Sequence, residues 1–277
     1  HRFARRLDAA AQLIEQARAR RRLLLLRSAV GGSCGCALLQ PCEARFSRGG
    51  GGARGFRLSL LGATALLRSL RGMQVTGVPK AKIAKALDDM RTDRVLPYRF
   101  IAAAQYAPDV EPELEHAMFR SIEGHAKLKG KTILLVDVSG SMDGLLSGRS
   151  EMRRLDAACG LAVLAREICE DVEIYTFSDA VKKVPARRGF ALRDAIVKSQ
   201  PHMSTYLGRA VQEVDRKGAR LIVFTDEQSH DRVDAPKGLG YMVNVASYQH
   251  GVGHGDWRRI DGFSEKILDW IIASEQG

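Results

Sequence analysis

The stretch KTILLVDVSGSM, residues 131–142, decides the fold. Its apolar run at 133–138 is interrupted only by Asp137, and glycines lie on either side of it, which is typical of a buried strand. A charge at the end of such a strand is unfavourable unless it is paired or binds a metal. Asp137, Ser139 and Ser141 put three oxygen-bearing side chains at alternate positions of a tight loop. Such oxygens suit a hard cation such as Mg²⁺, although Asp, Ser and Gly are also ordinary turn formers.

A second strand pattern offers further oxygen ligands. Residues 219–225, ARLIVFT, are followed at once by Asp226, so another acid lies just past the end of a buried strand. Thr205 lies in the polar turn HMSTY, before a helical stretch at 207–214. Because sites in open α/β sheets form outside the carboxyl ends of the strands, we expect these side chains near the first loop. Turn formation and helix capping are the alternative roles of the serines and of Thr205.

The combination of D-x-S-x-S, a later Thr and a later T-D resembles the metal-ion-dependent adhesion site of von Willebrand factor type A domains. The resemblance implies a doubly wound α/β domain that binds Mg²⁺ or another divalent cation. It implies direct binding by the hydroxyls, and binding by the acids directly or through water. The metal-binding residues that it implies are Asp137, Ser139, Ser141, Thr205 and Asp226. Met203 and Ser204 precede the threonine where the family more often has glycine, which is a departure from the pattern.

Strand and helix patterns alternate through the rest of this region. Helices are expected at 155–168, 190–197, 207–214 and 263–272. Strands are expected at 172–177, 220–225 and 242–246, with a hairpin-like piece at 181–184. This alternation predicts a mostly parallel sheet with helices on both faces.

Helical patterns precede the α/β region. Apolar residues at helical spacing predict helices at 63–73, 80–90, 97–107 and 111–122. Short helices in succession are typical of part of a HEAT-like helical repeat array. The predicted division is an Arg- and Gly-rich segment at 1–58, a partial helical-repeat segment at 59–128 and a von Willebrand type A domain at 129–277.

Three segments of the helical region, together with the D-V-S-G-S-M strand, resemble the Ro autoantigen (TROVE module) family, particularly its bacterial members. These segments are LLRSLRGM at 66–73, GVP at 77–79 and RVLPYRFIAAAQYAP at 94–108. The resemblance covers residues 62–277 and implies a ring of helical repeats whose ends the von Willebrand type A domain joins. Most of that ring is missing and the chain begins without methionine, so we expect an N-terminally truncated member.

The resemblance also implies partners. The family binds Y RNA and the single-stranded ends of misfolded noncoding RNA, so a cytoplasmic ribonucleoprotein of RNA quality control is expected, with an exoribonuclease as a further candidate partner. The candidate RNA-binding residues are Arg68, Arg71, Lys80, Lys82 and Lys85. The alternative is an ordinary solvated face, balanced by Asp88, Asp89 and Asp93.

The net charge of +11 is concentrated in residues 1–72, which hold fourteen arginines, no lysine and three acids. An Arg-rich segment can bind phosphate, but its composition also suits a flexible linker or non-native coding sequence. The chain has no apolar run of about 18 residues, so no membrane helix is expected. Cys159 and Cys169 are expected to be reduced core residues, which favours an intracellular setting.

Catalysis is not expected. His202 and His230 lie near the candidate ligands in the sequence, but no G-x-S-x-G elbow is present and the serines are better explained as metal ligands. Glu227 and Asp231 are interpreted as a solvated acidic rim. The competing hypothesis is a metal-dependent protein-interaction scaffold of the von Willebrand type A class, which uses the cation to bind an acidic group on a protein partner without RNA.

Overall fold

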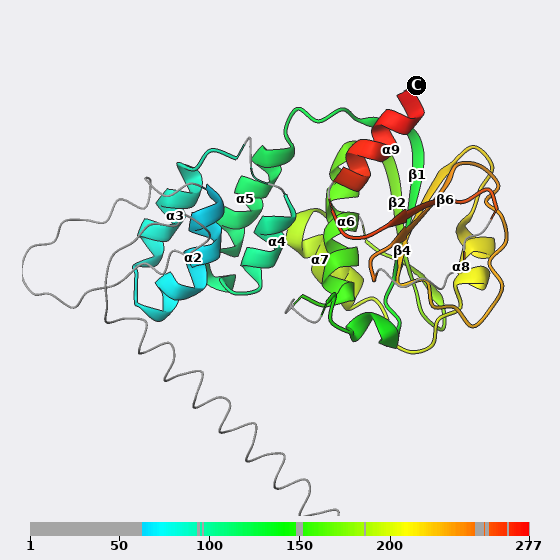
Figure 1. Ribbon diagram of the computed structural model, residues 1–277, viewed down its shortest axis with the longest axis horizontal. Coiled ribbons are helices and arrows are strands. Elements are labelled where there is room, and N and C mark those ends of the chain that lie inside the picture. Colours follow the sequence, from blue (N-terminus) through cyan, green and yellow to red (C-terminus); the bar gives the residue numbers. More distant parts are fainter. Residues whose placement is uncertain are drawn as a thin grey trace, which may run out of the picture. The chain divides into compact units, whose positions relative to one another are not determined.

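Figure 1 shows the computed structural model of the 277-residue chain. The structure describes residues 63–92, 95, 97–147, 152–185, 187–246, 252, 255–264 and 266–276. The predictions for residues 1–58 lie outside the described residues. The chain from Gly55 onward belongs to one compact unit. Among the described residues, no helix has both the length and the apolar character needed to cross a membrane.

Helices precede the sheet, as the periodicity predicts. They are α2 (Ala63–Val75), α3 (Lys80–Asp88), α4 (Tyr98–Ala104) and α5 (Glu111–Ile122). Their apolar faces meet in a core that contains Leu70, Leu87, Phe100 and Leu114, all at most 1% exposed. Helix α2 packs on α4, and α3 packs on α5. The helical spacing of the apolar residues therefore defines the buried faces of this segment.

The described residues after this segment form a six-stranded sheet in the order β3-β2-β1-β4-β5-β6. The strands are β1 (Leu128–Asp137), β2 (Cys169–Phe177), β3 (Val181–Lys183), β4 (Arg220–Thr225), β5 (Gly240–Asn244) and β6 (Arg258–Asp261). Neighbouring strands are parallel except for the β2–β3 pair. This is a doubly wound order, and the winding reverses between β1 and β4, where such sheets bind ligands.

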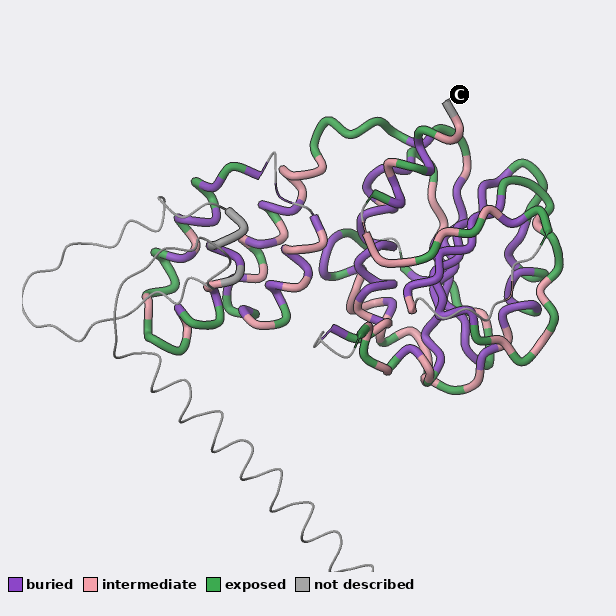
Figure 2. Tube along the Cα trace, viewed as in Figure 1, coloured by how far each residue is buried: buried purple, intermediate pink, exposed green. Residues whose placement is uncertain are grey.

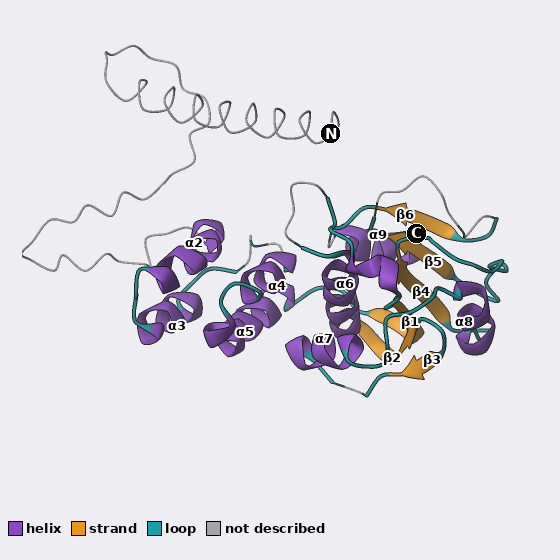
Figure 3. Ribbon diagram, turned by 90° about the horizontal axis from the view of Figure 1, so that it is seen from below, coloured by secondary structure: helices purple, strands orange, loops and turns teal. Residues whose placement is uncertain are grey.

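Helices cover both faces of the sheet (Figure 3). They are α6 (Arg154–Ile168), α7 (Gly189–Val197), α8 (Leu207–Val214) and α9 (Lys266–Gln276). Alternate residues of β1 point to opposite faces, so Leu134 and Val136 share a core with α6 and α9, whereas Ile133 and Leu135 share one with α8. Burial on both faces explains the nearly continuous apolar runs of β1 and β4, which Figure 2 shows as buried.

The predicted fold class, a helical segment followed by a doubly wound α/β domain, is confirmed. Cys159 and Cys169 are buried free thiols, also as predicted. The closing helix begins at Lys266 rather than at residue 263. Strand β6 was not expected, because its residues RRID are only alternately exposed and it has just one neighbouring strand, β5.

The helical segment and the α/β domain share one core. A Cβ at Gly160 of α6 would lie 3.1 Å from Ile101 Cδ1 of α4, so glycine allows these helices to approach closely. The Glu115 carboxylate of α5 accepts a hydrogen bond of 2.6 Å from the backbone N–H of Phe190, in the first turn of α7. The predicted boundary between residues 128 and 129 stays a prediction, and the shared core indicates that the two segments stabilise each other.

Candidate metal centre

Two fully buried acids lie at the carboxyl ends of the central strands. Asp137 is the last residue of β1, and Asp226 directly follows β4. Because β1 and β4 pair in parallel, with Val136 opposite Phe224, the two acids reach the same edge of the sheet. Both side chains are completely buried. This edge is the point where the winding reverses, so the sequence-based placement of a site there has a structural basis.

Neutral donors surround Asp137. The backbone N–H of Ser139 donates to Asp137 Oδ1 at 2.9 Å, and the Thr225 hydroxyl donates to Asp137 Oδ2 at 2.7 Å. Burial raises the pKa of Asp137 to about 7, although the hydrogen bonds from Ser139 and Thr225 oppose the rise. Among the described residues, Asp137 has no basic partner, and a buried carboxylate in this position is a candidate for a cation.

The two serines of the first loop are spaced as cation ligands would be. Ser139 Oγ and Ser141 Oγ lie 3.1 Å apart, on a short 3₁₀ turn at Gly140–Asp143. Neighbouring ligands of an octahedral ion with bonds of about 2.1 Å are about 3 Å apart. Ser139 is buried, like Asp137, and Ser141 is half-buried, so of these three side chains only that of Ser141 reaches solvent. The hydroxyl pair and Asp137 therefore fit a divalent cation of the magnesium class.

The turn that carries Thr205 lies against this loop. The Gly140 N–H donates to the Met203 carbonyl at 2.9 Å, which joins the two segments directly. Ser178, just after β2, holds the turn that carries Thr205. Its hydroxyl accepts a hydrogen bond from the Met203 N–H at 2.8 Å and donates one to the Ser204 carbonyl at 3.1 Å. Thr205 itself is only 4% exposed. The hydrogen bond between Gly140 and Met203 thus holds the Thr205 turn next to the first loop, and cation binding by Thr205 stays a prediction.

Asp226 differs from Asp137 because it has a basic partner. Arg154 Nη1, from the first turn of α6, donates to Asp226 Oδ2 at 3.0 Å, and the Gln228 N–H donates to Asp226 Oδ1 at 3.3 Å. The same Arg154 nitrogen donates to the Ser141 carbonyl at 3.0 Å. The sequence-based interpretation did not include Arg154 or Thr225. Thr225 was detectable as the threonine of the T-D pair, whereas nothing local marks Arg154.

The cluster is rich in hydroxyls and poor in carboxylates. Among the described residues, no group of three or more His, Cys, Asp or Glu side chains lies close enough together to hold a metal. A cation at this centre would therefore depend on Ser139, Ser141 and Thr205 for much of its protein coordination. Neutral hydroxyls leave much of the charge of a divalent cation uncompensated, so such an ion would attract an anionic group from outside.

The other polar residues near the centre have structural partners. His202 Nε2 lies 3.1 Å from the Val197 carbonyl, and His230 Nδ1 lies 3.1 Å from the Thr205 carbonyl. Asp231 accepts hydrogen bonds of 2.8 Å from the N–H groups of Gly208 and Arg209 at the start of α8. Glu227 is 2% exposed and pairs with Arg259, so it is not the solvated rim residue that was predicted. The absence of catalysis stays a prediction.

Gly208 allows α8 to approach the loop that holds its first turn. A Cβ at this position would lie 2.0 Å from the Arg232 carbonyl oxygen, which is a backbone atom. We expect Gly208→Ala to lower the free energy of unfolding by about 1–3 kcal/mol and to weaken divalent-cation binding, because the Thr205 turn leads into this helix. Urea denaturation measures the first effect. Gly72→Ala in α2, where the added Cβ meets no atom within 4 Å, is the control and should not destabilise the protein.

Comparison with one solved structure supports the fold. No protein-family model and no curated protein matches the chain. The crystal structure of the Ro (RSR) protein of Deinococcus radiodurans superposes with a TM-score of 0.52 at 19% sequence identity, over 74% of this chain and 50% of that one. An aerotolerance-related membrane protein from Bacteroides fragilis matches 45% of this chain and 68% of its own, at a TM-score of 0.31 and 15% identity. The chain thus spans half of the Ro structure and has its fold over the matched part.

Proposed function

We propose that this chain is part of an Ro-type RNA-binding protein, which binds Y RNA and misfolded noncoding RNA in RNA quality control and holds a divalent cation in its α/β domain. The observation that carries the proposal is the hydroxyl-rich cluster at the ends of β1 and β4, in a domain that shares its core with a helical segment. The similarity in fold to the Ro structure supports the same combination.

The divalent cation, Mg²⁺ or another ion of its class, would be held by Ser139, Ser141 and Thr205, with Asp137 and Asp226 binding directly or through water. Its chemistry is that of a docking site, because a cation with mainly neutral ligands attracts anionic groups. The residues of this chain bury the two acids and orient the two serine hydroxyls, and no bond-breaking step is assigned to them.

The helical segment offers cationic side chains to the phosphates of RNA. Lys80, Lys82 and Lys85 of α3 are exposed, and none has an ion-pair partner among the described residues. Lys82 and Lys85 are three residues apart, so they lie on one face of the helix. Arg71 is exposed and lies 5.3 Å from the centre of the Tyr106 ring. Arg68 lies in α2, and its side chain is outside the described residues.

Replacing Lys80, Lys82 and Lys85 together with glutamine should weaken RNA binding about tenfold at moderate salt. Each lost phosphate contact should also reduce the dependence of log K on log salt by about 0.7 for single-stranded RNA. Fluorescence anisotropy with a stem–loop RNA that has a single-stranded 3′ end, at several salt concentrations and with or without Mg²⁺, measures both quantities. The effect follows from phosphate contact, which makes affinity sensitive to salt.

The matched control replaces Lys182, Lys198 and Lys217, three exposed lysines of the α/β domain, and changes the net charge equally. If both triple variants lose the same affinity, the loss reflects overall charge and the α3 surface is not the RNA contact. If the unaltered chain shows no salt-dependent RNA binding, the RNA part of the proposal is wrong.

One observation favours a second function, a metal-dependent protein-interaction scaffold that captures an acidic group on a partner. Two large apolar side chains flank the candidate centre and are exposed, Met203 at 59% and Leu145 at 54%. Their apolar area would be buried by a protein partner bound at the cation, which would add to the binding free energy. Complexes that need Mg²⁺ and survive ribonuclease would favour this function over RNA binding.

A further inference from the structure

Arg154 places a fixed positive charge inside the candidate metal centre. A single guanidinium nitrogen, Nη1, donates to Asp226 Oδ2 and to the Ser141 carbonyl, each at 3.0 Å. The Arg154 side chain is 12% exposed and that of Asp226 is completely buried. The Coulomb attraction within a pair so well removed from water is larger than that within a surface pair, and removing either member leaves an uncompensated buried charge.

The turn at residues 141–144 packs against the Arg154 guanidinium. The Gly144 N–H donates to the Ser141 carbonyl at 3.2 Å, and the Arg154 N–H donates to the Gly144 carbonyl at 2.9 Å. A Cβ at Gly144 would lie 3.1 Å from Arg154 Cζ, so the absence of a side chain there leaves room for the guanidinium. An antiparallel bridge joins Leu145, which follows Gly144, to Arg153, which precedes Arg154. The position of Arg154 is therefore set by the same loop that carries the serines.

The two acids of the centre are consequently in different electrostatic states. Asp226 is neutralised by a guanidinium, whereas Asp137 has only neutral hydrogen-bond donors among the described residues. A divalent cation that used Asp226 would have to share this carboxylate with Arg154 and would also be repelled by it. At the short distances inside such a cluster, repulsion between two cations is large in a poorly hydrated setting.

We infer that Arg154 is a built-in competitor of the divalent cation, which neutralises Asp226 when no metal is bound and lowers the affinity of the centre for metal. The inference rests on the proposed metal site and adds its regulation. Because the guanidinium is held by the 141–144 turn, metal binding and the position of this turn are coupled. With its affinity lowered in this way, the centre would gain or lose its cation as the free concentration of the ion changes.

The test compares Mn²⁺ binding by the full chain and by its Arg154→Gln variant, with electron paramagnetic resonance of the free ion as the readout. The variant is expected to bind Mn²⁺ at least about tenfold more tightly, because a nearby positive charge is removed. Arg153→Gln is the matched control, since Arg153 is the adjacent arginine, is 59% exposed and pairs with Asp143 instead. Its Mn²⁺ affinity should equal that of the unaltered chain.

A second measurement uses thermal unfolding. Without metal, Arg154→Gln should melt at a lower temperature than the unaltered chain, because Asp226 is left unpaired in the interior. Saturating Mn²⁺ should stabilise the variant more than the unaltered chain, since a ligand that binds the folded state more tightly stabilises it more. Should the variant fail to fold, the guanidinium NMR signal of Arg154 in the unaltered chain should shift when Mg²⁺ is added.

The outcomes separate the inference from the metal site itself. The inference is overturned, and the metal site stands, if Arg154→Gln binds Mn²⁺ as tightly as the unaltered chain or more weakly. The same holds if the NMR signal of the Arg154 guanidinium does not shift when Mg²⁺ is added. If neither protein binds Mn²⁺, both the inference and the metal site are wrong. Tighter binding by the variant alone supports both.

Discussion

Replacing Asp137 with alanine is expected to abolish divalent-cation binding, with a loss of affinity of about a hundredfold or more. The reason is the uneven distribution of charge in the centre. Of the five candidate ligands, three are neutral hydroxyls, and the Asp226 carboxylate is paired with Arg154. Asp137 alone offers a carboxylate without a basic partner among the described residues, so it should supply most of the attraction for the cation.

Isothermal titration of the full chain with Mg²⁺ or Mn²⁺ measures this loss. Asp143→Ala is the matched control, because Asp143 belongs to the same loop, is exposed and pairs with Arg153. RNA affinity should stay unchanged in both variants if the cation and the RNA occupy separate surfaces. Retention of metal binding by Asp137→Ala would sink the proposed centre, and loss of RNA affinity together with metal affinity would show that the two surfaces are linked.

The elements that the sequence predicts well are those whose signal is local. Helix α8 and strand β4 begin and end at the predicted residues. Burial of one face gives the helix apolar residues at a spacing of about 3.6, and burial of both faces gives the strand a continuous apolar run. Strand β6 lacks such a signal, since only one strand pairs with it and its side chains are alternately exposed. Edge strands have the weakest constraint on composition, which explains the omission.

The candidate centre shows the same division between local and long-range information. The acids Asp137 and Asp226 are visible in the sequence because each follows an apolar strand, and parallel pairing then brings them together. Arg154 is invisible there, because its contact with Asp226 depends on how the chain returns after Gly144. A motif therefore points to the candidate ligands of such a site, whereas the charged residues that would alter its affinity are seen only in the folded structure.

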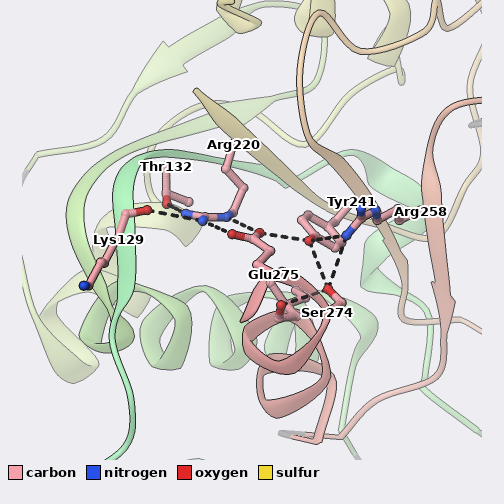
Figure 4. Close-up of polar contacts among 8 residues, drawn as sticks. Lys129, Thr132, Arg220, Tyr241, Arg258, Ser274 and Glu275 are labelled. Atoms are coloured by element: carbon pink, nitrogen blue, oxygen red, sulfur yellow. Dashed lines mark hydrogen bonds and ion pairs between the residues drawn. The ribbon is translucent and has the colours of Figure 1, made fainter. Parts of the chain in front are cut away.

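A buried polar network lies toward the amino-terminal ends of the strands, at the end of the sheet opposite the candidate metal centre (Figure 4). Arg220, the first residue of β4, donates from Nε to Glu275 Oε1 at 2.6 Å and from Nη1 to the Thr132 hydroxyl at 2.7 Å. Tyr241 of β5 donates to the same Glu275 oxygen at 2.9 Å, and Arg258 of β6 donates to the Tyr241 hydroxyl at 3.1 Å. The network thus joins four strands to helix α9.

Arg220→Met and Glu275→Gln are each expected to lower the free energy of unfolding by about 3–5 kcal/mol, because either change leaves a buried charge without its partner. Arg220 and Glu275 side chains are 7% and 14% exposed. Lys266→Met is the control, since its pair with Asp269 on the same helix is well exposed and should contribute less than about 1 kcal/mol. Urea denaturation at neutral pH measures all three, and equal effects would contradict the role of burial.

The same network predicts how the Glu275→Gln effect depends on pH. Burial alone would raise the pKa of Glu275, but hydrogen bonds from Arg220 and Tyr241 outweigh burial and place it below the ordinary value of 4.5. The ionised form therefore stabilises the fold above pH 4.5, and this contribution is lost as the pH falls through the lowered pKa. The difference in stability between the unaltered chain and the variant should be largest at neutral pH and should shrink in acid.

Metal affinity should not change in Glu275→Gln, because Arg220 and Asp226 lie at opposite ends of β4. A parallel loss of metal binding would show that the two ends of the strand are coupled.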